Sequence, residues 1–206
     1  MKLKTEAKRA EIIEIAIQIF KERGFEKTSI LEISSRLGGS KSTLYNYFQS
    51  KEELFFETIR KRVETDIEMT FGSLNFKQEN IIETLCAFGE NFLSYIYSDE
   101  IFTTRMLAIA GDPQRELGKV VYNNGICKAH NIISIFLEEA MRLHKLRTAD
   151  PLVAAKHLLA LLESETLLPY LLHVKTKLSK EEITNITKRA IDVFIKAYGI
   201  SNESKE

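Results

Sequence analysis

The chain has 206 residues, of which 44% are hydrophobic and 28% are charged, with only 3 prolines and 9 glycines. This composition excludes a disordered chain and predicts a helix-rich globular protein of one large domain or two small ones. The formal net charge is zero, but residues 1–62 hold 13 lysines and arginines against 9 acids, which leaves 16 against 20 for the remainder. This excess of basic residues in the N-terminal segment is compatible with a domain that binds a polyanion.

The sequence predicts neither export nor a membrane span. The start, from Met1 to Glu6, lacks the apolar run of a secretory signal, and no later segment is long and apolar enough to cross a bilayer. Cys86 and Cys127 are too few for a disulfide scaffold, and Cys127 with His130 gives only two potential metal ligands. We expect a cytoplasmic protein with no metal site and no cofactor.

Three short helices and one long helix are expected in the first 72 residues. Gly24 and Gly38 suit the left-handed ends of the first two helices. Thr28 and Ser29 are equally good N-caps for the second helix, and Ser40 can cap the third by accepting a backbone N–H. We place these four helices at residues 5–23, 28–37, 40–48 and 51–71.

Longer helices are expected after residue 72. Asp150 with Pro151, and Ser179 with Glu182, mark the starts of the last two, and Gly125 can split an earlier one. We place these helices at residues 78–97, 100–110, 115–143, 151–173 and 180–198. The fold class is therefore all-α with about nine helices. We expect a DNA-binding domain at 1–50, a larger helical domain at 51–200 joined through the helix 51–71, and a frayed tail at 201–206.

The second and third helices, joined at residues 38–39, match a helix-turn-helix arrangement. Leu44 and Phe48 lie four residues apart, so they share a face that can anchor the third helix to a core. Thr28 and Lys51 stand at helix N-termini, where backbone N–H groups favour a phosphate. The rest of the third helix is polar, as a surface for base edges and phosphates must be. A capped surface turn with tucked aromatic rings is the alternative that polarity alone leaves open.

The run GFEKTSILEISSRLGGSKSTLYNYFQSKEELFFETI, residues 24–59, resembles the DNA-binding domain of the TetR family of bacterial transcriptional regulators. Gly39 stands where the family usually has Val or Ile, which predicts a looser turn. Ser34 and Ser42 also replace residues that the family usually has. The matching elements are Gly24-Phe25, Thr28-Ser29, Ile33, Ser40-Lys41, Thr43-Leu44-Tyr45, Tyr47-Phe48 and Ser50-Lys51-Glu52 with Leu54.

The resemblance implies a set of DNA-contacting residues around the third helix. Phosphate contacts are implied for Thr28, Tyr47 and Lys51. The remaining implied contacts, to bases or backbone, come from Ser29, Ser40, Lys41, Ser42, Thr43, Tyr45 and Asn46. The residues ahead of the first helix, Lys2, Lys4 and Thr5, can reach a neighbouring phosphate or simply lie in solvent.

The resemblance also implies an inducer pocket and a dimer interface in the back half. The implied pocket lining is Phe88, Phe92, Tyr95, Phe102, Met106, Tyr122, Cys127, Asn131 and Tyr170. The last two long helices are implied to pair with those of a second subunit through Ala154, Ala155, Leu158, Leu159, Leu162, Ile191, Phe194 and Ile195. A helix that is apolar almost all round is also what the core of a monomer contains.

The function expected on these grounds is that of a ligand-responsive repressor. It binds a palindromic double-stranded operator as a homodimer and is released by a small, mostly apolar inducer. An enzyme is not expected, because the sequence has no Gly-x-Gly-x-x-Gly, P-loop, nucleophile elbow or His-Glu-x-x-His motif. The alternative is a helical protein-interaction module without DNA activity.

Overall fold

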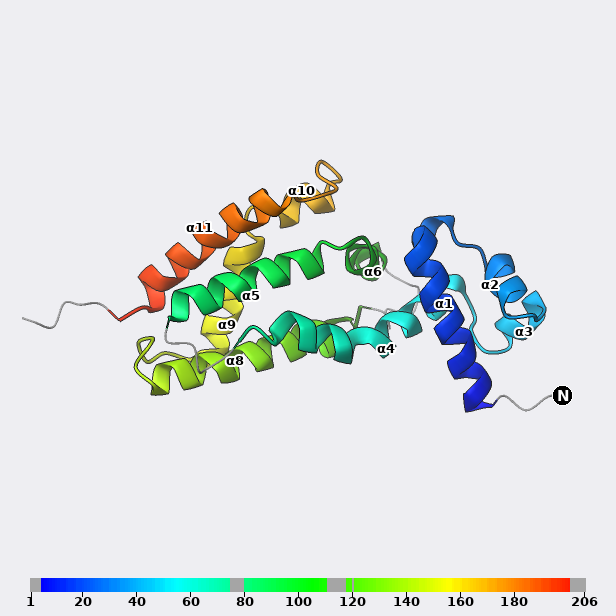
Figure 1. Ribbon diagram of the computed structural model, residues 1–206, viewed down its shortest axis with the longest axis horizontal. Coiled ribbons are helices and arrows are strands. Elements are labelled where there is room, and N and C mark those ends of the chain that lie inside the picture. The colour runs from blue at the N-terminus through cyan, green and yellow to red at the C-terminus, as the bar shows by residue number, and fades with distance from the viewer. Residues whose placement is uncertain (1–4, 75–79, 111–117, 120, 201–206) are drawn as a thin grey trace, which may run out of the picture. The chain divides into compact units, whose positions relative to one another are not determined.

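The computed structural model describes residues 5–74, 80–110, 118–119 and 121–200, and these residues are helical or in short connections (Figure 1). The all-α class is confirmed. Lys2, Lys4, the start of the helix expected at 115–143 and the tail at 201–206 lie outside the described residues. The helices are α1 (Glu6–Lys27), α2 (Ile30–Arg36), α3 (Lys41–Tyr45), α4 (Lys51–Phe71), α5 (Ile81–Ile96), α6 (Asp99–Ala110), the π-helical turn η1 (Val121–Ile126), α8 (Cys127–Arg142), α9 (Pro151–Glu163), α10 (Leu167–Leu171) and α11 (Lys180–Tyr198).

The chain folds into two compact units. The head unit comprises Met1–Glu64 with Asp99–Val121, and the body unit comprises Thr65–Ser98 with Tyr122–Glu206. Helix α4 therefore begins in the head unit and ends in the body unit, and α6 belongs to the head unit. This division differs from the domain bounds expected at 1–50 and 51–200. The assignment of DNA binding to the first domain stays a prediction.

The core of the head unit is made by α1, α2, α3 and the first turns of α4. Three aromatic rings occupy its centre. The ring of Phe55 lies with its centroid 4.9 Å from that of Phe20 and 4.8 Å from that of Phe25. Ile12 and Ile19 on the inner face of α1 are fully buried beside them. This core buries enough apolar surface to hold helices that are too short to be stable alone.

Local chemistry marks the helix ends where the sequence predicts them. Gly24 has φ +76° and interrupts the helical backbone near the end of α1. Ser29, Ser40, Asp150 and Ser179 each accept a backbone N–H from the first turn of the following helix. At the last of these, Glu182 completes a capping box; its hydrogen bond from Lys175 and those from Ser179 lower its pKa to about 2.

The body unit is a bundle in which α9 packs against both α8 and α11, and α11 also packs along α5 (Figure 1). Gly89 on α5 lies where side chains of α9 and α11 approach its backbone closely. A Cβ atom at this position would lie 2.7 Å from Thr187 Cγ2 and 2.9 Å from Leu162 Cδ2. Thr187 is fully buried, and among the described residues its hydroxyl has no hydrogen-bond partner.

The helix expected at 151–173 is a wrong prediction, because it is broken into α9 and α10. Pro169 has no N–H and its ring clashes with a helical carbonyl four residues earlier, so it fits only the first turn of a new helix. The break turns Thr166 inward, where its hydroxyl donates to Tyr97 Oη at 2.8 Å. Tyr97 Oη in turn donates to Glu163 at 3.4 Å. The break therefore forms a mostly buried polar cluster inside an apolar bundle.

The helix expected at 115–143 also differs from one continuous α-helix. Its described part begins with residues 118–119, continues as the π-helical turn η1 and becomes regular only at Cys127. Gly125, which the sequence marks as a possible break, lies in η1. None of the helices in the described part of the chain combines the length and the hydropathy that a membrane crossing requires.

The close approach at Gly89 generates a stability prediction. Gly89→Ala is expected to lower the free energy of unfolding by about 1–3 kcal/mol, because the added methyl group overpacks the contact between α5 and α11. Gly125→Ala is the control, since a Cβ atom there has nothing within 4 Å. Urea unfolding followed by circular dichroism measures both. Equal stability of the Gly89→Ala variant and the wild type would contradict the packing described here.

Candidate DNA interface

The recognition helix is α3 together with the turn that follows it, residues 41–48. Leu44 and Phe48 are 1% and 2% exposed and pack into the head-unit core, as their spacing predicts. The helical hydrogen bonding continues past α3, since Phe48 N donates to Leu44 O at 3.0 Å. Arg9 covers the outer side of the Phe48 ring, with Cζ 5.2 Å from its centroid. Two buried side chains therefore fix this element, with Tyr47 packed at the edge of the core.

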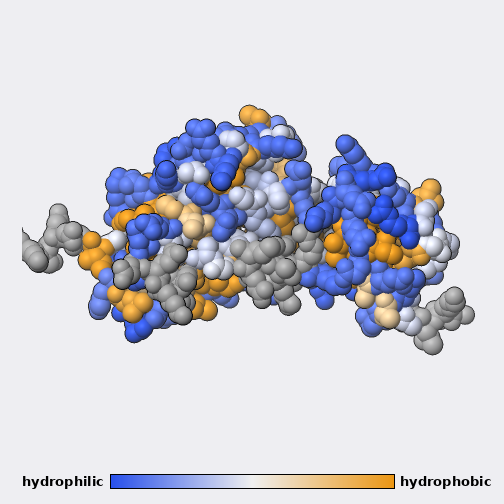
Figure 2. All heavy atoms as spheres, in the orientation of Figure 1, coloured by the Kyte–Doolittle hydropathy of each residue, from blue (hydrophilic) through white to orange (hydrophobic). Residues whose placement is uncertain are grey.

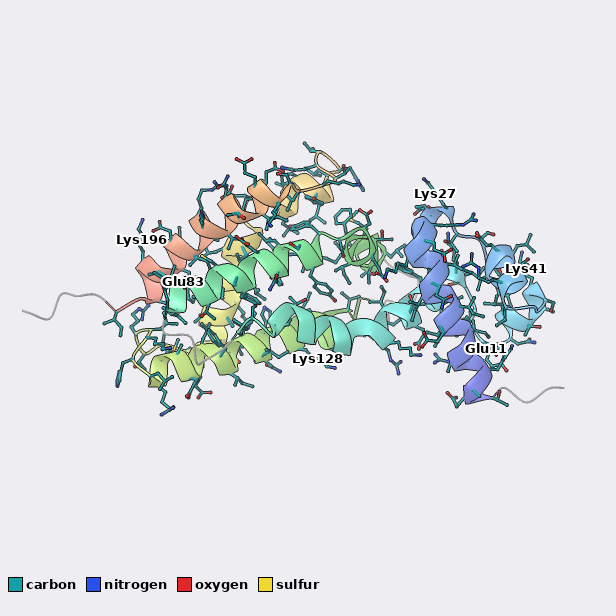
Figure 3. All side chains as sticks on the ribbon, viewed as in Figure 1. Glu11, Lys27, Lys41, Glu83, Lys128 and Lys196 are labelled. Carbon is teal, nitrogen blue, oxygen red and sulfur yellow. The ribbon has the colours of Figure 1, made fainter. Side chains whose placement is uncertain are left out.

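The outer face of the recognition helix carries the polar residues that the sequence predicts. Lys41 projects from the outer side of α3 (Figure 3), and its Nζ lies 5.6 Å from the centroid of the Tyr45 ring. No carboxylate forms an ion pair with Lys41 in the described part of the chain. The exposed side chains of this face are Ser40, Lys41, Ser42, Tyr45 and Asn46, whereas Thr43 and Tyr47 are half-buried.

Hydroxyl groups cluster at the start of the recognition helix. Ser40 Oγ lies 2.7 Å from Ser42 Oγ and 3.0 Å from Thr43 Oγ1. It also accepts the backbone N–H of Thr43 at 3.2 Å, which is the cap that the sequence predicts. At the other end of the helix, Tyr47 Oη accepts the backbone N–H of Thr5 at 3.4 Å. The phenol therefore joins the recognition helix to the first turn of α1.

Three of the predicted contact residues lie at helix junctions beside the recognition helix. Ser29 is exposed and caps α2. Thr28 is buried, and its hydroxyl donates to Gly24 O at 2.7 Å. Lys51 is half-buried, and its Nζ donates to Phe25 O at 3.0 Å and to Thr28 O at 3.3 Å. The polar groups of Thr28 and Lys51 are therefore already used inside the protein.

The turn between α2 and α3 is closed by two hydrogen bonds. Gly38 N donates to Ser35 O at 3.1 Å and Gly39 N donates to Ser34 O at 3.0 Å, which is a Schellman motif. Gly38 has φ +67°, so this position needs glycine. Gly39 has no such need, and a Cβ atom there would meet Leu37 at 3.7 Å. At Gly39 the turn lacks a side chain, but the backbone N–H groups of both glycines are paired.

Two arginines near the recognition helix in sequence are paired with carboxylates. Arg36 pairs with Glu22 at 3.0 Å and Arg23 pairs with Glu32 at 2.8 Å. These pairs are exposed and contribute little to stability. They do, however, reduce the free positive charge beside the recognition helix. Lys41 is for this reason the cation of that helix best placed for a new partner.

The predicted pocket residues are spread over both units. Phe88 and Phe92 on α5 are buried with their ring centroids 5.7 Å apart, and Tyr170 is buried against Tyr97 at 4.2 Å. Tyr122 and Asn131 are exposed. The half-buried members of the set are Tyr95 and Cys127 of the body unit and Phe102 and Met106 of the head unit. A pocket formed by all nine stays a prediction.

The body unit also contains buried groups that the sequence analysis did not select. Thr166 and Tyr97 form the polar cluster at the α9–α10 break, and Pro169 was the signal that could have located it.

Cys127 and His130 belong to no group of three or more potential metal ligands among the described residues. Burial, and next the charge of Lys156, lower the pKa of His130.

The predicted dimer seam stays a prediction. Seven of its eight residues are buried within a single chain, where they form the contacts of α9 and α11 with their neighbours. The sequence pattern could not separate a core helix from an interface helix, because both are apolar almost all round. Only Ile195 is partly exposed. The exposed apolar residues of the same region are Leu152, Val153, Leu168, Leu172, Val174, Val193 and Ile200.

Two family models match the chain. One, described as bacterial regulatory proteins of the tetR family, matches residues 12–58, which include α2, α3 and the start of α4. The other, described as the C-terminal domain of AefR-like transcriptional repressors, matches residues 83–200, more than half of the chain. Together the two models include the whole recognition helix and most of the body unit.

Known proteins give the same picture. The uncharacterized HTH-type transcriptional regulator YfiR of Bacillus subtilis (strain 168) is 34% identical over 73 residues, which are 35% of this chain and about a third (34%) of YfiR. A crystal structure described as a TetR-family transcriptional regulator from Mesorhizobium loti has a TM-score of 0.80 at 23% identity and covers 97% of this chain and 100% of its own. The structure of the Flavonoid-responsive Regulator FrrA has a TM-score of 0.65 at 29% identity, with 95% and 98% covered.

The two adjacent glycines of the turn generate a paired prediction. Gly38→Ala is expected to lower the free energy of unfolding by about 1 kcal/mol, because a left-handed backbone is costly for a residue with a Cβ atom. Gly39→Ala is expected to leave it unchanged or raise it by about 0.4–1 kcal/mol, because alanine restricts the unfolded chain more than glycine does. Urea unfolding of both variants measures the difference. A larger loss for Gly39→Ala than for Gly38→Ala would contradict this assignment.

Proposed function

Because the chain belongs to the TetR family of bacterial transcriptional regulators, we propose that it represses transcription by binding a palindromic operator as a homodimer. A small, mostly apolar inducer then releases it from the DNA. Repression is supported by the match of residues 83–200 to the model of AefR-like transcriptional repressors. One observation supports the proposed DNA contact. The outer face of the recognition helix is polar and exposed, and two buried side chains on its other face hold the helix in place.

The proposed contact surface consists of the exposed and half-buried polar residues of this face. Lys41 and Asn46 contact base edges, since lysine donates to guanine and asparagine forms paired hydrogen bonds with adenine. Tyr47 contacts a phosphate, which its hydroxyl can reach while still accepting from Thr5. The hydroxyls of Ser40, Ser42 and Thr43, the phenol of Tyr45 and the exposed Ser29 supply further contacts. Thr28 and Lys51 are left out of this surface because their polar groups bind inside the protein.

Dimerisation is proposed through the exposed apolar residues of the body unit, in place of the residues first expected. One recognition helix contacts few base pairs, whereas a two-fold axis presents two helices to two half-sites. We define the proposed interface surface by four exposed residues: Val153, Leu168, Leu172 and Val193 are each 42–64% exposed in the single chain. Figure 2 shows an apolar patch near α10, at the top of the view, within a mostly hydrophilic surface. Burying this surface against a second copy removes it from water.

The inducer is proposed to be a small aromatic molecule that binds in the body unit. FrrA, which this chain resembles at 29% identity, is named as flavonoid-responsive. The body unit offers aromatic rings of the matching kind, with Phe88, Phe92, Tyr97 and Tyr170 close to one another in pairs. Inducer binding must lower DNA affinity by the same factor by which DNA lowers inducer affinity. Isothermal titration with and without DNA tests this reciprocity.

A helical protein-interaction module without DNA activity is the competing function. Selection of bound duplexes from random double-stranded DNA separates the two. The proposal expects enrichment of sequences with two-fold symmetric halves, and an affinity that weakens steeply with salt as counterions are released. No enrichment, or an affinity that does not change with salt, would favour the interaction module.

The contact surface generates a specificity prediction. Lys41→Ala and Asn46→Ala are expected to change which sequences are enriched, because each removes a contact to base edges. Tyr47→Phe is expected to lower the affinity for all sequences evenly, because it removes a contact to the backbone. Fluorescence anisotropy with the selected duplex and with single-base variants of it measures these effects. Asn185→Ala, an exposed position on α11 in the body unit, is the control and should change neither property.

The interface surface generates an assembly prediction. Leu168→Asp and Val193→Asp are each expected to weaken the dimer at least about tenfold, because a charge is buried without a partner when the two copies associate. Ile135→Asp is the control, since this residue of α8 is 62% exposed but lies outside the proposed surface. Sedimentation velocity over a range of concentrations measures the association. A wild-type monomer, or dimers unaffected by both substitutions, would contradict the proposal.

A further inference from the structure

One large aliphatic side chain of the helix-turn-helix is exposed. Leu31, in the first turn of α2, is 64% exposed. Between residues 5 and 61, the exposed large apolar residues are Leu31 and Tyr45, which belong to α2 and α3. Single exposed leucines are common on protein surfaces, so the position of Leu31 is what matters. Exposed apolar side chains of this size are confined to the two helices of the motif over this part of the chain.

Two ion pairs identify the flank of α2 that faces α1. Glu32 of α2 pairs with Arg23 of α1 at 2.8 Å. Arg36, at the end of α2, pairs with Glu22 of α1 at 3.0 Å. Residues four positions apart share one face of a helix, so both ion-paired positions lie along the same flank. This flank of α2 is therefore turned toward α1.

Leu31 lies on a different flank of the same helix. Ile33 and Leu37 are buried and mark the face of α2 that packs on the core. Successive residues of a helix are separated by about 100°, which places Leu31 and Ser35 on the flank that faces neither the core nor the ion pairs. Both residues are exposed. Helix α2 packs against α1 and against α3, and α3 lies at the outer end of the head unit (Figure 1). Leu31 is therefore on the side of α2 that is turned away from α1.

An aliphatic side chain has one favourable partner on the surface of DNA. Leucine neither donates nor accepts a hydrogen bond, so it gains nothing from a phosphate oxygen or a polar base edge. The apolar group that the major groove presents is the 5-methyl group of thymine. A contact between Leu31 and this methyl group removes apolar surface of both from water. It also adds information that the hydrogen bonds of Lys41 and Asn46 do not provide.

Given the DNA binding proposed above, we propose that Leu31 is a specificity-determining residue that contacts the 5-methyl group of one thymine in each half-site. The first helix of the motif thereby adds an apolar contact to the hydrogen bonds made by the recognition helix. Deoxyuridine differs from thymidine only in lacking this methyl group. Replacing the contacted thymidine by deoxyuridine therefore removes the contact and leaves the hydrogen-bonding groups of the base pair in place.

A deoxyuridine scan tests the contact on the wild-type protein. Each thymidine of the duplex selected by the wild type is replaced in turn, and fluorescence anisotropy measures the affinity. One position in each half-site is expected to weaken binding about fourfold, which corresponds to one buried methyl group. A scan in which no position changes the affinity, or a selected duplex whose half-sites contain no thymine, would overturn the proposal.

A double-mutant cycle assigns the methyl contact to Leu31. Leu31→Ala is expected to bind the thymidine and deoxyuridine duplexes equally well at that position, and to keep the wild-type melting temperature because the side chain is exposed. Thr43→Ser removes the methyl group of a recognition-helix residue and should retain the fourfold difference. Ile109→Ala, at a 61% exposed position of α6, should retain both the difference and the affinity.

The outcomes separate this inference from the proposed function. A fourfold difference that persists in Leu31→Ala would overturn the assignment to Leu31 and leave DNA binding standing. A Leu31→Ala variant that binds the selected duplex as tightly as the wild type would do the same, and the exposed leucine would then serve a partner other than DNA. If the wild type selects no duplex at all, the proposed function itself fails.

Discussion

The attachment of the recognition helix by Leu44 and Phe48 is the contact on which the rest of the head unit depends. A helix of five residues has no stability of its own in water, so it exists because these two side chains are buried in the core that α1 supplies. With the apolar side committed to the core, all other positions of the helix are free to be polar. The same two residues thus explain both the fold and the exposed surface.

Some polar side chains of the head unit are bound within the protein, and others face outward. Thr28 and Lys51 are bound by backbone carbonyls, and Arg23 and Arg36 are bound by carboxylates. Lys41 and the hydroxyl groups around Ser40 are left facing outward. Positive charge by itself does not distinguish a lysine or arginine that can contact DNA from one that is already bound within the protein. The hydrogen-bond partners divide them into groups that hold the fold and groups that can meet a ligand.

The sequence predicted the features that short-range chemistry determines. Gly24 has the expected left-handed backbone, although α1 continues past it to Lys27, and Gly38 and Ser40 marked their helix ends correctly. A left-handed backbone or a capped N–H depends on a few neighbouring residues. It failed where the outcome depends on packing between distant segments. The helix expected at 151–173 is broken, and the hydroxyl of Thr166 at the break donates to Tyr97, which is distant in the sequence. The resemblance to the TetR family located the candidate site, whereas the partners of Lys51 lie far from it in the sequence and depend on the fold.

The proposed function depends on the outer face of the recognition helix being the surface that contacts DNA. Amide hydrogen exchange of the protein, with and without the duplex that it selects, tests this most directly, because protection reports where a ligand binds or restricts the backbone. If this face contacts DNA, new protection within the head unit is concentrated at residues 40–48 and at the start of α2. Protection that appears elsewhere in the head unit while residues 40–48 exchange as in the free protein would contradict it.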